Sequence, residues 1–478
     1  LYWYLQQKLK WGIMVAYNYY KTQEIHSMKI IIVGGGKTGS ALARSLSGEN
    51  HDVTVIEKRA DKLQELCDDN DIMGIVGSGL DNDALSEAGI ESADLLIAVT
   101  AGDEDNLLCC LFAKKNAECD TIARVRNPLY VAETDFIKQS VGLSMIINPE
   151  YESAKSIARI VRVPSVVEMN TFFDGMMDML TFKVGAGSIL DGQNLSYVRN
   201  NIEQDVLFCT VQRNGESIIP SGDFTLAGGD KASIIINPAK ATEFFTKIGV
   251  SQKPIRSVMI AGGGTTGFYV AKQLIEMGIN VCIVEIDEDR CNELAELLPK
   301  ALIIHGDASD KQILAEEGVY DYDAFVALTG FDEENIMLSL SVKDLTGNKV
   351  ITKIDRVAFT DLIAKLNLDS VVYPYVLTDE YILQYVRSKN NTKGSNVEKI
   401  YKLIGDEVEA LEFKIGEKSR IIGKPLRRLK FKPNVIICGI LHRGKFIIPD
   451  GNSVLRPGDR MVVVTGQKNL NDVGDILN

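Results

Sequence analysis

Two glycine-rich segments, each followed by an acidic residue, are the parts of this sequence best suited to bind a ligand. In the first, Gly34, Gly36 and Gly39 fit the spacing G-x-G-x-x-G, and Glu57 follows Gly39 by 18 residues. The first glycine of this pattern permits a tight turn, the second lets a phosphate approach the backbone, and the third lets a helix pack closely on a strand. The carboxylate is placed to accept hydrogen bonds from ribose hydroxyls. The segment therefore predicts a site for a dinucleotide or an adenine nucleotide; the alternative is a strand-to-helix turn that packs but binds nothing.

A second copy of this segment lies in the second half of the chain. The 28 residues that begin at Ile30 align without a gap at an offset of 228, and ten positions are identical. The basic residues differ, because Thr265 stands where the first loop has Lys37, and Lys353 stands in place of Arg124. Lys37 lies within the loop, where it can reach a phosphate, so the first site is expected to be better equipped for a polyphosphate. The copy keeps the glycines and the carboxylate as Gly262, Gly264, Gly267 and Glu285.

The elements around the first glycine segment follow from its hydrophobic pattern. Short β-branched runs alternate with helical stretches, which indicates βαβ units and a parallel sheet covered on both faces. Further along, short strands separated by Gly, Asp and Asn turns are typical of a small β-rich domain. Both parts recur in the second half, later at an offset of 229, so the whole unit is duplicated. The strands of the first alternating part are expected at 29–34, 52–57, 72–77, 94–100, 121–125 and 144–149.

The duplication predicts four domains, and the fold class is α/β. Two Rossmann-type domains are expected at 28–150 and 255–378. Each is followed by a crossover helix and a small α+β, β-rich domain, at 151–250 and 379–478. The polar stretch "SKNNTKGSN" in the last of these is expected to be a flexible linker. Residues 1–27 are interpreted as an upstream extension or a cloning artefact, and the alternative is an amphipathic helix that binds a partner.

Composition and missing motifs narrow the classes of function. The net charge of −13 argues against nonspecific binding to nucleic acid or to an anionic membrane surface. Eight cysteines without a C-x-x-C spacing, and only four histidines, favour reduced thiols over a metal cluster or disulfides. Neither a catalytic acid–base set nor a G-x-x-x-x-G-K-[ST] motif accompanies the loops, so no catalysis is expected. The enzyme alternative is a pyridine-nucleotide oxidoreductase.

The chain after Met28 resembles the TrkA family, the peripheral nucleotide-binding subunits of the bacterial Trk potassium uptake system. The segments "MKIIIVGGGKTGSALARSL", "GSGLDNDALSEAGIESADLLIAVTAGDEDNLL" and "TIARVRNPLY", and the repeated "IIP.G...L..GD" blocks, carry the resemblance. It implies two tandem RCK units, each a Rossmann subdomain followed by a β-rich subdomain. It also implies that adenine nucleotides, ATP/ADP or NAD/NADH, bind the Rossmann subdomains.

The same resemblance implies roles for individual residues at matching motif positions. Glu57 would bind ribose, Thr100 would line the pocket at the end of the fourth strand, and Arg124 would supply positive charge. Gly77 and Ser78, after the third strand, would face the adenosine half. The loop residues implied in phosphate and cofactor binding are Gly34, Gly36, Lys37, Thr38 and Gly39. In the second repeat, the implied loop residues are Gly262, Gly264, Thr266 and Gly267. Glu285, Asp307 and Thr329 are the counterparts of Glu57, Ser78 and Thr100.

The sequence departs from this family pattern in two places. Ser78 stands where the second repeat keeps the more usual Asp307. Glu150, in "NPEYESAKS", matches an acidic position linked to cation or nucleotide coupling in RCK rings, but the second repeat has Tyr375 there. No other metal ligand is expected. These departures argue against the two units binding ligand alike.

The resemblance also implies partners and a location. Nucleotide binding would gate a membrane potassium channel of the TrkH type, and the alternative is regulation of a different ion transporter. RCK units assemble into rings, so a homotetramer of this chain would supply eight units. The protein would be cytoplasmic and peripheral on the inner face of the membrane. The segments "DEDNLL" and "DEENIM", after Thr100 and Thr329, are interpreted as acidic first turns of helices favoured by the helix dipole.

Overall fold

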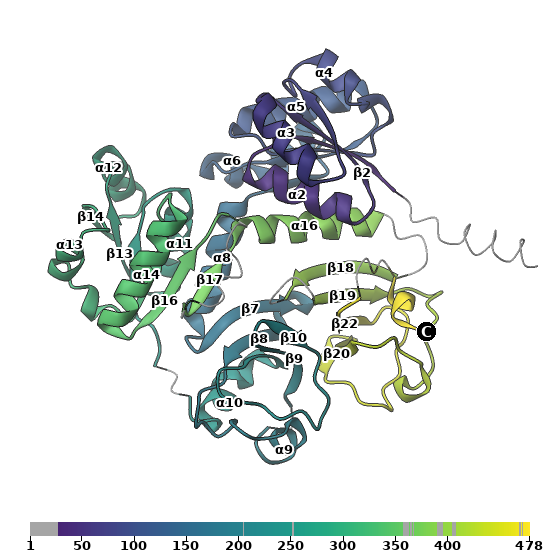
Figure 1. The fold of residues 1–478 in the computed structure, drawn as a ribbon, viewed down its shortest axis with the longest axis vertical. Helices are drawn as coiled ribbons and strands as arrows, with labels where there is room; N and C mark the ends of the chain where they lie inside the picture. The colour runs from purple at the N-terminus through teal and green to yellow at the C-terminus, as the bar shows by residue number, and fades with distance from the viewer. Residues whose placement is uncertain are drawn as a thin grey trace, which may run out of the picture. The chain divides into compact units, whose positions relative to one another are not determined.

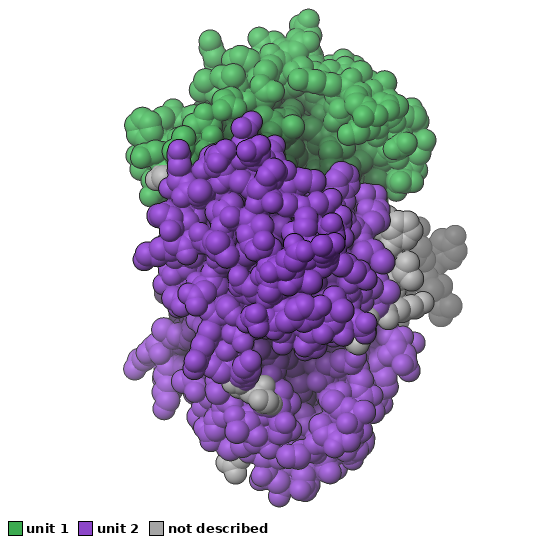
Figure 2. Space-filling view, turned by 90° about the vertical axis from the view of Figure 1, so that its left-hand side faces the viewer, with its two compact units in different colours: residues 1–147 green, residues 148–478 purple. Residues whose placement is uncertain are grey.

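The computed structural model describes residues 27–203, 205–250, 253–356, 363, 366, 368–389, 395–403, 408–467, 470 and 472–478. The predicted extension, apart from Ser27, and positions 390–394 of the predicted linker lie outside the described residues. By compactness the chain divides into two units, residues 1–147 and 148–478, which Figure 2 shows in different colours. Each unit is taken by itself below.

The first unit is built on a six-stranded parallel sheet. Its strand order is β3-β2-β1-β4-β5-β6. The central strands read as nearly continuous apolar runs because helices cover both faces of such a sheet; all four residues of β4 are buried. The strands are β1 (Lys29–Val33), β2 (Asp52–Glu57), β3 (Met73–Val76), β4 (Leu95–Ala98), β5 (Asp120–Arg124) and β6 (Met145–Ile147). The helices are α2 (Lys37–Gly48), α3 (Ala60–Asp69), α4 (Asn82–Glu87), α5 (Asp103–Asn116), α6 (Pro128–Ala132) and α7 (Thr134–Val141).

The strand order places a binding crevice beside the first glycine segment. Strand β1 pairs in parallel with β2 on one side and with β4 on the other, so the order reverses at β1. Ligands of open α/β sheets bind outside the carboxyl ends of the strands at such a switch point. The glycine segment follows β1 directly, and it therefore lies at this crevice.

The second unit begins with the first β-rich domain. Its five-stranded sheet has the order β10-β9-β11-β8-β7, and the strand pairs are antiparallel. The helices of this part are α8 (Pro149–Arg162), α9 (Leu195–Asn201) and α10 (Ala241–Lys247). The strands are β7 (Val166–Phe172), β8 (Met177–Lys183), β9 (Leu207–Arg213), β10 (Glu216–Ile218) and β11 (Lys231–Ile236).

The second parallel sheet repeats the topology of the first, with the order β14-β13-β12-β15-β16-β17. Figure 1 shows its helices packed around it. The strands are β12 (Ser257–Ala261), β13 (Asn280–Glu285), β14 (Leu302–His305), β15 (Ala324–Ala327), β16 (Lys349–Lys353) and β17 (Ser370–Val372). The helices are α11 (Thr265–Glu276), α12 (Glu288–Leu297), α13 (Lys311–Glu316) and α14 (Asp332–Thr346).

The second β-rich domain packs against the first within this unit (Figure 1). A shared core contains side chains of both sheets, and Cys209 and Cys438, which lie 229 positions apart in the chain, both belong to it. Equivalent residues of the two repeats thus face one interface. The elements are α16 (Pro374–Lys389), β18 (Ser395–Lys402), β19 (Glu409–Ile415), β20 (Val435–His442), β21 (Lys445–Ile447) and β22 (Arg460–Thr465). The predicted fold class, two Rossmann-type domains each followed by a small β-rich domain, is confirmed.

Helix α8 belongs to the second unit even though it follows the first Rossmann-type domain in sequence. Ala154 and Ile157 of α8 share a core with Val270 of α11. The rings of Tyr151 and Tyr269 pack edge to face, with their centroids 5.3 Å apart. The start of α8 is therefore held beside the second glycine loop. Within the described part of the chain, none of the helices has the length and hydrophobicity needed to cross a bilayer.

Candidate nucleotide-binding sites

Two glycines of the first loop are required by its backbone. Gly34 has φ of +108°, a conformation that residues with a side chain rarely adopt. At Gly39, a Cβ atom would overlap the carbonyl oxygen of Gly34, so only a glycine lets α2 pack this closely on the end of β1. Gly36 differs, because a Cβ there meets no atom within 4 Å. Gly34 and Gly39 are thus needed for the fold of the loop, whereas Gly36 faces open space.

The start of α2 borders that space and has no side-chain cap. Gly36 is the N-cap residue, it provides no side-chain cap, and the first turn of α2 contains no acidic residue. The first backbone N–H groups of a helix and the positive end of its dipole together attract an anion. Helix α11 begins in the same way after Gly264, also with no side-chain cap and no acidic residue in its first turn.

Glu57 is anchored by the loop that it faces. Its Oε2 accepts a hydrogen bond from the Gly35 N–H at 2.7 Å, and its Oε1 accepts one from the Arg59 N–H at 3.0 Å. Each carboxylate oxygen keeps a second lone pair, which can accept from a ribose hydroxyl. In the second repeat, Glu285 accepts from Gly263 at 2.6 Å and from Asp287 at 3.0 Å. The arrangement is therefore reproduced bond for bond.

A buried asparagine joins the ends of two strands beneath the first site. Asn106, fully buried, accepts hydrogen bonds through Oδ1 from the Thr100 N–H at 2.8 Å and from the Thr100 Oγ1 at 2.7 Å. Its Nδ2 donates to the Arg124 carbonyl at 2.9 Å. Asn335 likewise accepts from the Thr329 N–H at 2.8 Å and donates to the Lys353 carbonyl at 3.1 Å. Sequence reasoning missed this role, although both acidic segments contain the asparagine at the same place.

The acidic residue that opens α5 also has a more specific role than the helix dipole predicted. Asp103 is buried, and its Oδ2 accepts from the N–H groups of Arg126 and Asn127, both at 2.8 Å. Asp332 holds Asp355 and Arg356 in the same way, at 2.9 Å each. Both helices do begin with an acidic first turn, as interpreted, and these carboxylates in addition hold the chain that follows the fifth strand of each sheet.

A cavity of about 310 Å³ lies at the first loop. Among the expected residues, it is lined by Gly34, Gly36, Glu57, Gly77, Ser78 and Thr100. The other expected residues, Lys37, Thr38, Gly39 and Arg124, do not line it. Sequence reasoning missed the lining residues Lys58, Lys62, Asp105 and Cys109. Burial raises the pKa of Cys109 to about 12, so this thiol remains protonated and is no nucleophile.

The positions of Lys58 and Lys62 in the sequence could have identified them as site residues. Lys58 directly follows Glu57 at the carboxyl end of β2, and Lys62 lies in the first turn of α3. Residues at these places face the crevice of a Rossmann-type sheet. The lysines that line the first cavity therefore come from the segment after β2.

A larger cavity, of about 500 Å³, lies at the second loop. Gly267 does not line this cavity. A Cβ at this position would overlap the Gly262 carbonyl, so the role of Gly267 is to let α11 pack closely on the loop. Glu150, at the start of α8, also lines this cavity. No cluster able to hold a metal ion occurs among the residues that the structure describes. The expected residues that line it are Gly262, Gly264, Thr266, Glu285, Asp307 and Thr329, together with Lys353.

The two cavities differ in the charges around them. At the first, the carboxylates of Glu57 and Asp105 are balanced by Lys58 and Lys62. At the second, four carboxylates and a single lysine line the space: Glu150, Glu285, Asp307, Glu334 and Lys353. A polyphosphate is repelled by like charge in a confined site, so the first cavity suits it better.

Comparison with known families agrees with this architecture. Residues 30–149 and 258–374 match the TrkA-N domain, and residues 179–249 and 410–478 match the TrkA-C domain. The chain belongs to the TrkA family. The matches alternate along the chain as the two kinds of domain do, and the family places the chain in potassium transport.

Relatives match over nearly their whole length. A protein of Methanosarcina mazei named Trk system potassium uptake protein TrkA homolog 1 is 32% identical over 444 residues, which cover 91% of this chain and 97% of that protein. The Trk system potassium uptake protein TrkA of Haemophilus influenzae is 32% identical over 451 residues, or 93% of this chain and 98% of that protein. Both relatives therefore align with this chain across both of its repeats.

Solved structures show the same RCK fold at lower sequence identity. The GsuK RCK domain has a TM-score of 0.61 and 17% identity, with 92% of this chain and 93% of that chain covered. The GsuK channel bound to NAD has a TM-score of 0.60 and 17% identity, with coverage of 92% and 77%.

Proposed function

We propose that this chain is a non-catalytic regulatory subunit that binds adenine nucleotides, ATP/ADP or NAD/NADH, and thereby gates a membrane potassium channel of the TrkH type. The observation that carries the proposal is the repeated arrangement of an uncapped helix N-terminus and an anchored carboxylate at the switch point of each parallel sheet. The first group suits a phosphate and the second a ribose, and every candidate ligand contains both.

The two sites are proposed to differ in preference. The balanced charges at the first cavity favour a polyphosphate such as ATP, whereas the carboxylates at the second favour a ligand with fewer negative charges, such as NAD or NADH. The solved GsuK channel is described as bound to NAD, which supports a dinucleotide as one ligand of this fold. Glu57 would accept a hydrogen bond from a free ribose 2′-hydroxyl. NAD has this hydroxyl and NADP carries a phosphate in its place, so the site favours NAD.

The family supports the proposed partner and location. Relatives are named as potassium uptake proteins of the Trk system, so the proposed partner is the membrane channel subunit of that system. We place the protein in the cytoplasm, peripheral on the inner face of the membrane, as a homotetramer whose eight RCK units form a ring. Coupling requires that nucleotide bind two ring geometries with different affinity, since a ligand shifts only an equilibrium whose states it distinguishes.

The test is potassium flux through a TrkH-type channel in proteoliposomes, measured with this chain and each nucleotide in turn. Gly36→Asp is the informative variant, because a side chain at Gly36 meets no atom and an aspartate is a favourable N-cap residue. Its carboxylate would occupy the phosphate position while the protein stays folded. We expect nucleotide-dependent flux to fall at least about tenfold in this variant, the loss of a charge-assisted contact.

The matched control is Gly48→Asp, which adds the same charge at the other end of the same helix. Gly48 is exposed, and a Cβ there also meets no atom within 4 Å. Nucleotide-dependent flux should be retained in this control. A folded Gly36→Asp protein that no longer binds nucleotide but still shows unchanged nucleotide-dependent flux would contradict the proposal.

A further inference from the structure

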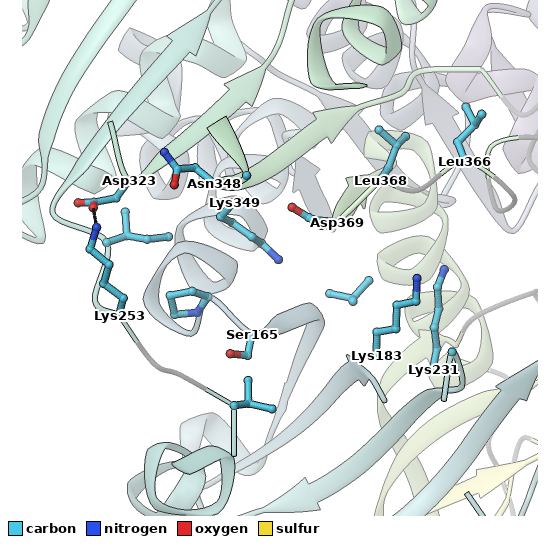
Figure 3. Close-up of a pocket in the computed structure, with 16 residues that line it drawn as sticks. Ser165, Lys183, Lys231, Lys253, Asp323, Asn348, Lys349, Leu366, Leu368 and Asp369 are labelled. Carbon is cyan, nitrogen blue, oxygen red and sulfur yellow. Dashed lines mark ion pairs between the residues drawn. The ribbon is translucent and has the colours of Figure 1, made fainter. Parts of the chain in front are cut away.

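A cavity lined by lysines lies in the second unit, away from both glycine loops. Its volume is about 800 Å³, within the range of small-molecule sites. It is bordered by the first β-rich domain and by the second parallel sheet. Among the described residues that line it are four lysines, Lys183, Lys231, Lys253 and Lys349, and no arginine. Figure 3 shows Lys183 and Lys231 side by side, with their ammonium groups directed into the same space as that of Lys349.

Lys183 and Lys231 form a like-charge pair across two strands. They are direct register partners of the antiparallel strands β8 and β11. Like charges that face each other in this way destabilise a sheet. Burial, followed by the charge of Lys183, lowers the pKa of Lys231. The pKa of Lys231 is lowered even though the charge of Glu168 acts in the opposite direction, so a bound anion would favour the charged form of Lys231.

The carboxylates at the cavity are already engaged. Asp323 accepts from the Arg256 N–H at 2.8 Å and is paired with Lys253 at 3.1 Å. Asp369 is paired with Lys343 and accepts from the Val350 N–H at 3.1 Å. Glu168, whose charge acts on Lys231, accepts from the Asn170 amide at 2.8 Å. Lys231 makes no ion pair with any residue in the described ranges.

Lys349 adds a further cation on the opposite wall. It opens β16, and its Nζ donates to the Val166 carbonyl at 2.7 Å. Burial lowers the pKa of Lys349 to about 8, so at neutral pH the group is still largely charged. Desolvated ammonium groups attract an anion more strongly than groups in bulk water do.

The second repeat shows how the protein compensates an equivalent pair by itself. Lys414 on β19 and Arg460 on β22 face each other in the same register. There Arg460 is paired with Glu398 at 2.7 Å, and also with Asp174 and Glu412. In the first repeat the charge of Glu168 acts on Lys231, but no carboxylate among the described residues forms an ion pair with it. The difference leaves room for a ligand to supply the negative charge.

We propose that the cavity bordered by Lys183, Lys231 and Lys349 is a binding site for a small phosphorylated polyanion, separate from the glycine-loop sites. Phosphate is favoured over a carboxylate because lysines act as compact point charges, whereas arginine is the side chain that matches planar carboxylates. The site lies where the first β-rich domain meets the second parallel sheet, so its occupant would fasten the two together. This proposal does not rest on the function proposed above.

The test is calorimetric titration of the full chain with inorganic triphosphate at low ionic strength. Gly36→Asp and Gly264→Asp are both present in the background, so that binding at the glycine loops is suppressed. We expect binding that weakens at least tenfold in Lys231→Met and in Lys183→Met, and that weakens as salt is raised. Methionine keeps the length and packing of the side chain, and either substitution relieves the repulsion in the unliganded protein.

Lys414→Met is the matched control, because Lys414 is the exposed counterpart in the second repeat. It should leave triphosphate affinity unchanged. A thermal melt supplies a second readout: triphosphate should raise the melting temperature of the parent and of Lys414→Met, and should raise that of Lys183→Met and Lys231→Met by clearly less. Absence of binding in the parent, or equal binding in the parent and in both lysine variants, would overturn the proposal.

Discussion

A single methyl group at Gly39 is expected to lower the stability of the first unit by at least about 3 kcal/mol, whereas the same group at Gly36 should change it by less than about 1 kcal/mol. The Cβ of Gly39→Ala would overlap the backbone carbonyl of Gly34, which cannot move aside as a side chain can. To make room, α2 must separate from the end of β1. At Gly36 the space is open and the backbone is extended, so alanine fits.

Urea unfolding followed by hydrogen exchange measures this difference. Exchange at the amides of β1 and β4 reports on the first unit alone, which matters because a chain of two units does not unfold in a single step. Gly267→Ala should repeat the effect in the second unit, where its Cβ would overlap the Gly262 carbonyl. Equal protection of β1 in Gly39→Ala and Gly36→Ala would show that the close approach of α2 to β1 is not required.

Arg387→Met is expected to destabilise the second unit by about 3–5 kcal/mol. Arg387 and Glu409 form a two-pronged ion pair, with Nη1 to Oε2 at 2.9 Å and Nη2 to Oε1 at 3.1 Å. Their side chains are only 1% and 4% exposed. Removing the guanidinium takes both of these bonds away from a buried carboxylate, and this loss dominates the effect.

The double variant Arg387→Met with Glu409→Leu separates that penalty from packing. A buried ion pair replaced by apolar side chains of similar volume is often neutral in stability, so the double variant should recover most of the loss. Urea denaturation of the three variants provides the comparison. If the double variant were as unstable as Arg387→Met alone, the position would depend on shape and not on an orphaned charge.

The fold could be predicted from the sequence because its signals are local and occur twice. Each strand of the first parallel sheet was expected within a residue or two of its place, since a strand buried on both faces reads as a short apolar run. The duplication then carried the same topology to the second half. The order of the strands and the packing of α8 on α11 depend on contacts between distant residues, which a single sequence does not reveal.

The candidate sites could be predicted only in part. The glycine spacing and the acidic residue that follows it identified Gly34, Gly36 and Glu57, all of which line the first cavity. Lys37 and Arg124 were chosen for their charge, but neither lines the cavity, because charge alone does not determine where a long side chain lies. The buried Asn106 was missed because its hydrogen bonds join strand ends that are distant in sequence.

The central claim, that the glycine loops bind adenine nucleotides, is tested most directly by calorimetry. The chain would be titrated with ATP, ADP, NADH and NAD, and affinity and stoichiometry per chain would be measured for the parent, Gly36→Asp and Gly48→Asp. We expect tight binding of at least one nucleotide, with one site per chain lost in Gly36→Asp and none in Gly48→Asp. Binding of none of the four, or equal binding in Gly36→Asp and the parent, would contradict the assignment and leave the first loop as a packing turn.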